Sequence, residues 1–200
     1  MSVLVGKMAP DFTASAVMPD NTINDKFNFT TYTKGKVGIL FFWPADFSFV
    51  CPSEIIAFNN KLEDFEALGA TLVGCSVDSK FVHLAWKNIP QDKGGIGKIN
   101  FPLVADVGGE IAKKYDILTE GNIALRGTFL IDQAGKVVHQ VVNDLPLGRN
   151  IEEVMRITNA LIFTQKNGEV CPANWHKGQE GMKANSESVV EYLAKYGNNL

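Results

Sequence analysis

The chain has 200 residues, of which 46% are hydrophobic and 20% charged, and its formal net charge is −3. These values suit an ordinary globular domain and exclude a fibrous or intrinsically disordered chain. The slight negative charge argues against nucleic-acid binding, and the longest apolar run, Val37–Pro44, is too short to span a membrane. The sequence starts without a signal-peptide pattern, so we expect a cytoplasmic, reducing environment.

The first clear pattern is a strand, a helix and a second strand. An apolar run predicts a buried strand over Val37–Trp43, and β-branched residues predict another over Thr71–Val77. Between them, apolar residues at three- and four-residue spacing predict one helix over Pro52–Leu68, with Gly69 at its C-terminal cap. Two strands joined in this way should be parallel neighbours with a right-handed crossover.

The rest of the chain continues this alternation. The expected elements are a helix over Ser79–Asn88, a strand over Phe101–Ala105, a helix over Gly109–Tyr115, a hairpin of strands over Gly127–Asp132 and Lys136–Asn143, and helices over Asn150–Gln165 and Ser186–Tyr196. The order predicts an α/β fold. From residue 167 onward Gly, Asn, Lys and Pro become more frequent. We therefore expect a domain over residues 1–166 and a C-terminal arm over residues 167–200.

The three cysteines, Cys51, Cys75 and Cys171, are odd in number and far apart. They do not form the dense pattern of a secreted disulfide framework, and no CxxC motif points to a thioredoxin-type dithiol or a zinc site. Cys75 lies inside an apolar strand and is interpreted as an inert core thiol. Cys51 and Cys171 are each followed by proline, which makes them the candidates for chemistry.

Cys51 stands directly before the predicted helix that begins at Pro52. A helix start offers free N–H groups and the positive end of the helix dipole, both of which stabilise a thiolate. A thiol with an ordinary pKa of about 8.5 is only about 3% ionised at pH 7, and a dipole contributing about 0.3 to 1 kcal/mol cannot change that enough. A cationic neighbour is therefore required, and Arg126 and Arg149 are the candidates. Glu54 is expected either to cap the helix start or to orient an arginine.

Three segments carry a family resemblance. Phe42–Glu54 contains the spacing P-x-x-x-S-x-x-C, formed by Pro44, Ser48 and Cys51. This segment resembles the active-site signature of the peroxiredoxins, and Arg126 in LRGTFLID matches the arginine of that site. Gly168–Trp175 is similar to the resolving-cysteine segment of the typical 2-Cys peroxiredoxins, a subfamily that includes the bacterial alkyl hydroperoxide reductase C proteins. The resemblance covers nearly the whole chain.

The resemblance implies a thioredoxin-like fold with a central mixed sheet, and a two-step thiol peroxidase without a cofactor or metal. Cys51 would attack hydrogen peroxide or an alkyl hydroperoxide and become a sulfenic acid, and Cys171 of a partner subunit would form a disulfide with it. Ser48 and Arg126 would position the peroxide, Pro44 would shield the sulfur, and Glu54 and Arg149 would support them.

The same resemblance implies the partners. It predicts a homodimer, commonly assembled as a decamer of five dimers, and a thioredoxin-like protein or a flavoprotein as the reductant. Ser48 departs from the commoner threonine of the family, but it keeps the hydroxyl, so we expect activity to survive.

Other interpretations of these residues remain possible at the level of sequence. A ring-forming holdase chaperone is the alternative function, and a cysteine hydrolase would need a general base near Cys51 that no motif supplies. His83 and Trp86 lie on one face of a predicted helix and are interpreted as packing residues.

Overall fold

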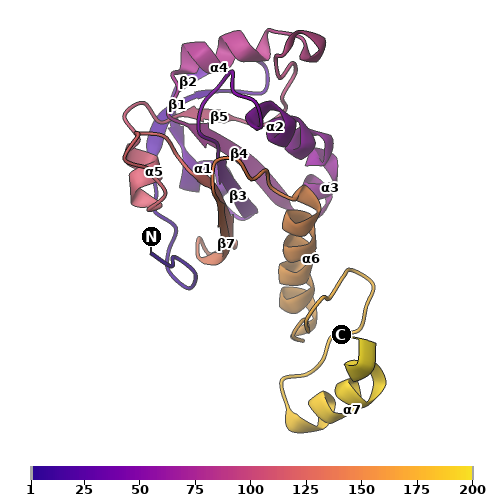
Figure 1. The fold of residues 1–200 in the computed structure, drawn as a ribbon. Coiled ribbons are helices and arrows are strands. Elements are labelled where there is room, and N and C mark those ends of the chain that lie inside the picture. Colours follow the sequence, from indigo (N-terminus) through magenta and orange to yellow (C-terminus); the bar gives the residue numbers. More distant parts are fainter. Residues whose placement is uncertain (1, 200) are drawn as a thin grey trace. The chain divides into compact units, whose positions relative to one another are not determined.

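The structure is a computed structural model that describes residues 2–199, and the chain divides into two compact units (Figure 1). The first unit ends at Ile151, and the second begins at Glu152. Each unit is described by itself below. The predicted division into a domain and an arm after residue 166 stays a prediction.

The first unit is built on a mixed seven-stranded sheet in the order β2-β1-β5-β4-β3-β6-β7, flanked by helices (Figure 1). The pairs β3/β4 and β4/β5 are parallel, and the other four pairs are antiparallel. This arrangement confirms the predicted α/β class with a mixed sheet. The strands are β1 (Thr13–Val17), β2 (Ile23–Asn28), β3 (Val37–Phe42), β4 (Ala70–Ser76), β5 (Leu103–Ala105), β6 (Arg126–Ile131) and β7 (Val137–Asn143).

The centre of the sheet is buried on both faces. Every residue of β3 and β4 is buried, as expected for parallel strands covered by helices on each side. Their register pairs Val37 with Ala70 and Phe42 with Cys75, so both strands end at the same edge. The predicted hairpin of β6 and β7 is also confirmed.

The prediction of a single helix over Pro52–Leu68 is wrong in one respect. It is two helices, α2 (Cys51–Asn60) and α3 (Leu62–Ala67), separated at Lys61, whose φ and ψ are −103° and 5°. Asparagine is a weak helix former, and Asn59 instead uses its side chain to accept a hydrogen bond from the Asn100 backbone N–H at 2.8 Å. Gly69 does end the second helix, with a φ of 71° that favours glycine.

The sequence pattern did not predict the first three elements, β1, β2 and α1 (Phe29–Thr33). In β2, only Phe27 is buried, because this strand forms one edge of the sheet. An edge strand with four polar residues lacks the apolar alternation on which strand prediction depends. The later helices α4 (Lys80–Lys87) and α5 (Glu110–Lys114) fall within their predicted ranges.

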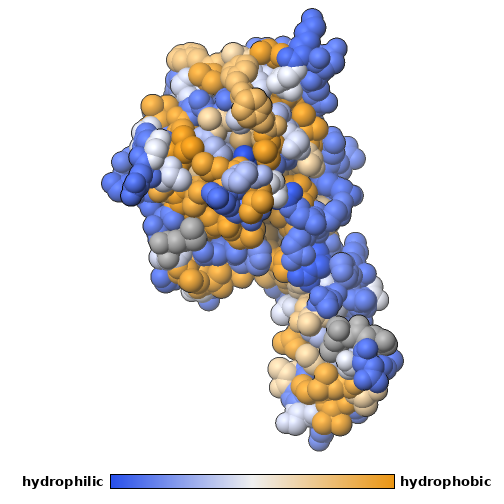
Figure 2. Space-filling view, in the orientation of Figure 1, coloured by the Kyte–Doolittle hydropathy of each residue, from blue (hydrophilic) through white to orange (hydrophobic). Residues whose placement is uncertain are grey.

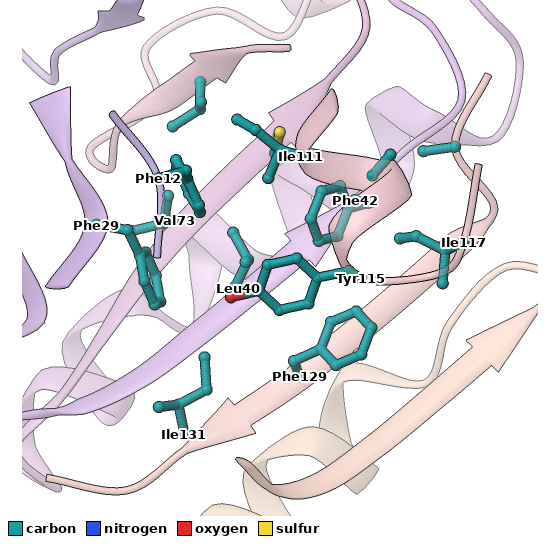
Figure 3. Packing of buried hydrophobic residues seen from close by; sticks show 14 of the residues in the cluster. Phe12, Phe29, Leu40, Phe42, Val73, Ile111, Tyr115, Ile117, Phe129 and Ile131 are labelled. Atoms are coloured by element: carbon teal, nitrogen blue, oxygen red, sulfur yellow. The ribbon is translucent and has the colours of Figure 1, made fainter. Parts of the chain in front are cut away.

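Aromatic side chains fill one side of the sheet. Phe42, Tyr115 and Phe129 pack together, with the Phe42 ring centroid 5.4 Å from that of Tyr115 and 6.0 Å from that of Phe129, and Leu40 lies beside Tyr115 (Figure 3). The Tyr115 hydroxyl donates to the Pro10 carbonyl oxygen at 2.9 Å, so the ring is buried without leaving its polar atom unpaired. This core fixes the end of β3, from which the chain leads to Cys51.

The second unit contains α6 (Ile151–Asn167) from Glu152 onward, α7 (Ser186–Tyr196) and the segment between them. Val170 and Met182 are joined by two backbone hydrogen bonds, which close the intervening segment into a loop. Helix α7 leaves Val190 and Leu193 exposed, and hydrophobic residues are visible at the surface of this unit in Figure 2. In the part of the chain that the structure describes, no helix is long and apolar enough to cross a membrane.

Candidate active site

Cys51 is the first residue of α2, at the end of the loop that follows β3. Val50 is the N-cap residue, and its carbonyl oxygen accepts hydrogen bonds from the backbone N–H groups of Ser53 and Glu54. Pro52 occupies the first turn, where its missing N–H costs nothing. Cys51 is completely buried as a free thiol, so its sulfur lies at the positive end of the helix dipole and away from bulk water.

The guanidinium of Arg126 lies against this sulfur. Arg126 begins β6, and its Nη1 is 3.3 Å from Cys51 Sγ. The same nitrogen donates to Glu54 Oε2 at 2.8 Å, and Nε donates to the Leu145 carbonyl oxygen at 2.7 Å. These two anchors hold the plane of the guanidinium in place, so a fixed positive charge faces the position where a thiolate would form.

The second candidate cation, Arg149, binds Glu54. Its Nε and Nη2 donate to the two carboxylate oxygens at 3.0 Å and 2.7 Å, and Nη1 donates to the Phe42 carbonyl oxygen at 2.7 Å. The guanidinium also lies over the ring of Phe41, 5.2 Å from its centroid. Burial lowers the pKa of Arg149 from its usual value, while Glu54 counteracts that shift.

Glu54 therefore orients arginines, which is one of the two roles expected from the sequence. Its carboxylate accepts hydrogen bonds from both Arg126 and Arg149, and it is almost completely buried. A buried carboxylate between two guanidinium groups fixes both of them through charge-assisted hydrogen bonds. The structure thus brings together Cys51, Glu54, Arg126 and Arg149, although the two arginines lie far from Cys51 in the sequence.

Pro44 and Ser48 lie in the loop between β3 and α2. Pro44 is buried, and Ser48 is half-buried with its hydroxyl donating to the Ala45 carbonyl oxygen at 2.8 Å. Two aromatic residues of the loop are much more open: Phe47 is 52% exposed and Phe49 is 99% exposed. The loop thus carries buried and open positions in alternation directly before Cys51.

Asp46, in the same loop, received no role from the sequence. Its carboxylate accepts a hydrogen bond from Trp43 Nε1 at 2.8 Å, and its second oxygen is 2.7 Å from Nδ1 of His83 on α4. His83 is buried, as predicted, but it forms a polar pair as well as packing. The two residues are 37 positions apart, and no sequence pattern links them, so only the fold reveals this pair.

Cys75 has a different environment from Cys51. It is fully buried in β4, and burial first, then the negative charge of Asp106, raise the pKa of its thiol well above the usual value. A thiol in such surroundings stays protonated and unreactive. The structure therefore agrees with the interpretation of Cys75 as a core residue.

Cys171 belongs to the second unit and is partly exposed as a free thiol. Its sulfur is 3.7 Å from the Ala160 carbonyl oxygen and 3.7 Å from Thr164 Oγ1, both on α6. Arg156 donates to the Trp175 carbonyl oxygen at 2.9 Å and so holds the segment that follows Cys171. Among the described residues, no group of His, Cys, Asp and Glu is arranged to hold a metal ion.

With this geometry in view, comparison with known proteins decides the family. Residues 5–140 match the AhpC/TSA family. The chain belongs to the AhpC/TSA family. Residues 160–196 match in addition the C-terminal domain of 1-Cys peroxiredoxin.

Individual relatives extend over nearly the whole chain. The chain is 52% identical to alkyl hydroperoxide reductase C of Helicobacter pylori, over 96% of both proteins. It is 47% identical to peroxiredoxin-1 of Gekko japonicus, again over 96% of both. The crystal structure of reduced 2-Cys peroxiredoxin from Plasmodium vivax superimposes with a TM-score of 0.93 at 46% identity, covering 96% of this chain and 100% of that one.

Membership of the AhpC/TSA family confirms the thioredoxin-like peroxiredoxin fold and the class of activity expected from the sequence. The protein is an enzyme, a thiol-dependent peroxidase that reduces peroxides with electrons from a reductant. Cys171 lies within the segment that matches the C-terminal domain of 1-Cys peroxiredoxin, and the structural likeness is to a 2-Cys peroxiredoxin.

Proposed function

We propose that Cys51 is the residue that this peroxidase oxidises. The observation that carries the proposal is the 3.3 Å contact between Arg126 Nη1 and Cys51 Sγ at the first turn of α2. A guanidinium at that distance and the helix dipole both favour the thiolate, which is the nucleophilic form of cysteine. Cys75 has no such support, and Cys171 is a partly exposed thiol beside a carbonyl oxygen.

In the proposed first step, the Cys51 thiolate attacks the terminal oxygen of a hydroperoxide. The S–O bond forms as the O–O bond breaks, so the sulfur is oxidised to a sulfenic acid and the leaving oxygen takes up a proton to give water or an alcohol. The Arg126 guanidinium, anchored by Glu54 and the Leu145 carbonyl, is placed to stabilise negative charge during this transfer. Ser48 would bind the peroxide once its hydroxyl turns from Ala45.

In the proposed second step, Cys171 of a partner subunit condenses with the sulfenic acid. One water is lost and an intersubunit disulfide forms, which a dithiol then reduces by exchange. Thioredoxin or a flavoprotein disulfide reductase is the proposed reductant, and a homodimer, assembled as five dimers, is the proposed oligomer. Cytoplasmic location is part of the same proposal, because a cycle that depends on free thiols needs a reducing compartment.

Hydrogen peroxide and alkyl hydroperoxides are the proposed substrates. The relatives named alkyl hydroperoxide reductase C support the second of these, and their identity to this chain is 51% to 54%. The comparisons give no support to the alternative of a holdase chaperone.

Consumption of peroxide in the presence of dithiothreitol tests the role of Cys51. The variant Cys51→Ser is expected to lose at least about a thousandfold in rate, because a serine hydroxyl is not ionised at neutral pH. Cys75→Ser is the matched control and should keep the rate. Equal consumption by the wild type and Cys51→Ser would refute the assignment.

Electrophoresis under non-reducing conditions tests the role of Cys171. After one equivalent of peroxide, the wild type should give a disulfide-linked dimer band, and Cys171→Ser should give none while still forming a Cys51 sulfenic acid. A dimer band that survives in Cys171→Ser would show that another cysteine resolves the intermediate. A monomeric wild type with a stable sulfenic acid would instead indicate a one-cysteine cycle.

A further inference from the structure

Cys171 lies against one face of helix α6. Its sulfur is 3.7 Å from the Ala160 carbonyl oxygen and 3.7 Å from Thr164 Oγ1. Arg156 precedes Ala160 by four residues and Thr164 by eight, so these three residues share one face of the helix. The helix face that meets the proposed resolving thiol therefore also carries a guanidinium group.

Hydrogen bonds fix the side chain of Arg156 in this position. Its Nε and Nη2 donate to the two carboxylate oxygens of Glu153 at 2.7 Å and 2.8 Å, and its Nη1 donates to the Trp175 carbonyl oxygen at 2.9 Å. Trp175 is buried, and its backbone N–H donates to the Pro172 carbonyl oxygen at 3.3 Å. The turn that begins directly after Cys171 is therefore tied to Arg156.

The neighbouring carbonyl group favours the protonated form of Cys171. A carbonyl oxygen accepts and cannot donate, so the S–H group forms the contact with Ala160, and this contact is lost when the thiol ionises. A thiolate in the same place would face the negative end of the carbonyl dipole. Its formation therefore requires compensation by a nearby positive charge.

Arg156 provides this positive charge. The hydrogen bonds to Glu153 raise the pKa of Arg156, and the negative charge of a Cys171 thiolate raises it further. Attraction between two charges acts equally on both of them, so the guanidinium in turn favours the thiolate. The electrostatic interaction agrees with the shared helix face and with the bond from Arg156 to Trp175.

The thiolate is the form of Cys171 that reacts in the proposed second step. It attacks the sulfur of the Cys51 sulfenic acid, and the S–S bond forms as the S–O bond breaks. The departing hydroxide takes up a proton, equal to the one that the thiol released, and becomes water. The rate of this step rises with the fraction of Cys171 that is present as thiolate.

We propose that Arg156, held by Glu153 and the Trp175 carbonyl, is a positioning residue that stabilises the Cys171 thiolate and thereby sets the rate of disulfide formation. The inference rests on the proposed role of Cys171 and assigns a function to a charge pair of the second unit. Glu153 weakens the effect, because its carboxylate neutralises part of the guanidinium charge.

Other charged or titratable side chains lie on the same two elements. Those nearest in sequence to the contacts of Cys171 are Lys166 on α6 and Glu169, His176 and Lys177 on the segment that follows it. They are the same in the wild type and in every variant described below. Differences among these proteins therefore report on Arg156 and Glu153.

Three substitutions separate the charge of Arg156 from its structural contacts. Arg156→Gln removes the charge, and Arg156→Lys keeps it while losing the two parallel bonds to Glu153. Glu153→Gln keeps the guanidinium and removes the negative charge that opposes it, so it should favour the thiolate. If the pair served only to hold the helix and the turn together, removal of either partner would have an effect of the same sign.

Alkylation of Cys171 in the reduced, full-length protein measures the thiolate. The rate of reaction with iodoacetamide is followed between about pH 6 and pH 10 by mass spectrometry of the peptide that contains Cys171. In Arg156→Gln we expect the midpoint of this pH profile to rise by about half a pH unit, equivalent to about threefold less thiolate at pH 7. The midpoint should fall in Glu153→Gln and stay close to that of the wild type in Arg156→Lys.

Rapid mixing with hydrogen peroxide measures the consequence for the catalytic cycle. Disulfide formation in Arg156→Gln should be about threefold slower than in the wild type at pH 7. The difference should nearly disappear at about pH 10, because the thiol is then largely ionised in both proteins. Formation of the sulfenic acid at Cys51 should have the same rate in the wild type and in all three variants, which provides the internal control.

The direction of the shifts decides the result. An unchanged pH profile in Arg156→Gln, or shifts of the same sign in Arg156→Gln and Glu153→Gln, would overturn the proposal. Disulfide formation that stays equally slow at high pH would overturn it too, because that result describes a structural contact. Absence of any disulfide in the oxidised wild type would refute the proposed role of Cys171 instead, and the alkylation profile would still decide whether Arg156 stabilises its thiolate.

Discussion

Cys51 and Cys75 are both completely buried free thiols of the first unit, and Cys75 is the register partner of Phe42, at the end of the strand that leads toward Cys51. Their surroundings differ in charge. Cys51 meets the guanidinium of Arg126 at a helix start, whereas Cys75 has an apolar environment and the negative charge of Asp106, which raise the pKa of its thiol. Burial alone raises the pKa of a thiol and so disfavours the thiolate. A fixed cation beside the sulfur favours the thiolate and makes a buried cysteine a candidate nucleophile.

The largest effect is expected from Glu54→Gln, which removes the anion that holds both guanidinium groups. Loss of one partner of a buried ion pair destabilises a protein by about 3 to 5 kcal/mol, and Arg149 would be left with unpaired charge. Urea unfolding measures this change. The control is Glu153→Gln, whose pair with Arg156 is partly exposed, so the substitution should cost less than about 1 kcal/mol. Equal effects in the two variants would contradict a structural role for the buried pair.

Arg126→Gln should remove most of the difference in reactivity between Cys51 and Cys75. Loss of the cation at 3.3 Å from Cys51 Sγ is expected to slow the reaction with hydrogen peroxide about a hundredfold, equivalent to about 2.7 kcal/mol. Competition for peroxide with horseradish peroxidase measures the rate. Arg126→Lys keeps the charge but loses the fork that binds Glu54 and Leu145 together, so an intermediate rate is expected. A rate unchanged in Arg126→Gln would show that the helix start suffices.

The pH dependence of the free energy of unfolding tests the raised pKa of the Cys75 thiol. The folded-state pKa of Cys75 is raised, so near pH 9 and above the unfolded chain loses this proton before the folded one does. Stability should therefore fall as pH rises, by at most about 1.4 kcal/mol per pH unit from this group. Cys75→Ala should have a shallower decline between pH 9 and 10 in chemical denaturation. An identical slope in both proteins would contradict the raised pKa.

The smallest effect is expected from Ser48→Thr. The substitution keeps the hydroxyl that donates to Ala45 and adds a methyl group that restricts its rotamers, so the peroxide rate should change by less than about threefold. Ser48→Ala removes the hydroxyl and should slow the same reaction about tenfold, which is at the upper end for the loss of one neutral hydrogen bond. A rate in Ser48→Ala equal to that of the wild type would exclude the hydroxyl from peroxide binding.

The sequence predicted the elements whose residues carry a strong pattern. The buried strand before Cys51, the parallel strand after α3 and the hairpin of β6 and β7 all follow from apolar runs and turn residues. The edge strand β2 and its neighbour β1 were not predicted, because β2 has many polar residues and β1 is built of small ones, so neither shows an apolar alternation. The break at Lys61 was also invisible, since no glycine or proline marks it in the sequence.

The same distinction applies to the candidate site. The position of Cys51 at a helix start follows from the adjacent proline, and the need for a cation follows from the energetics of ionisation. Charge alone does not say which arginine touches the sulfur; the family resemblance indicated Arg126, and the fold places Arg126 at Sγ and Arg149 on Glu54. The pair of Asp46 and His83 was missed because each looks ordinary until the fold brings them within 2.7 Å.

The pocket of Glu54, Arg126 and Arg149 has a further consequence when its charges are counted. Two guanidinium groups and one carboxylate sum to a single positive charge, which a thiolate at Cys51 cancels. In the proposed cycle, a sulfenic acid or a disulfide at Cys51 would be neutral, so each turnover would leave an uncompensated buried cation, and uncompensated buried charge is costly. Oxidation would therefore make the packed first turn of α2 less stable. Reduction would restore the anion and make this turn more stable again.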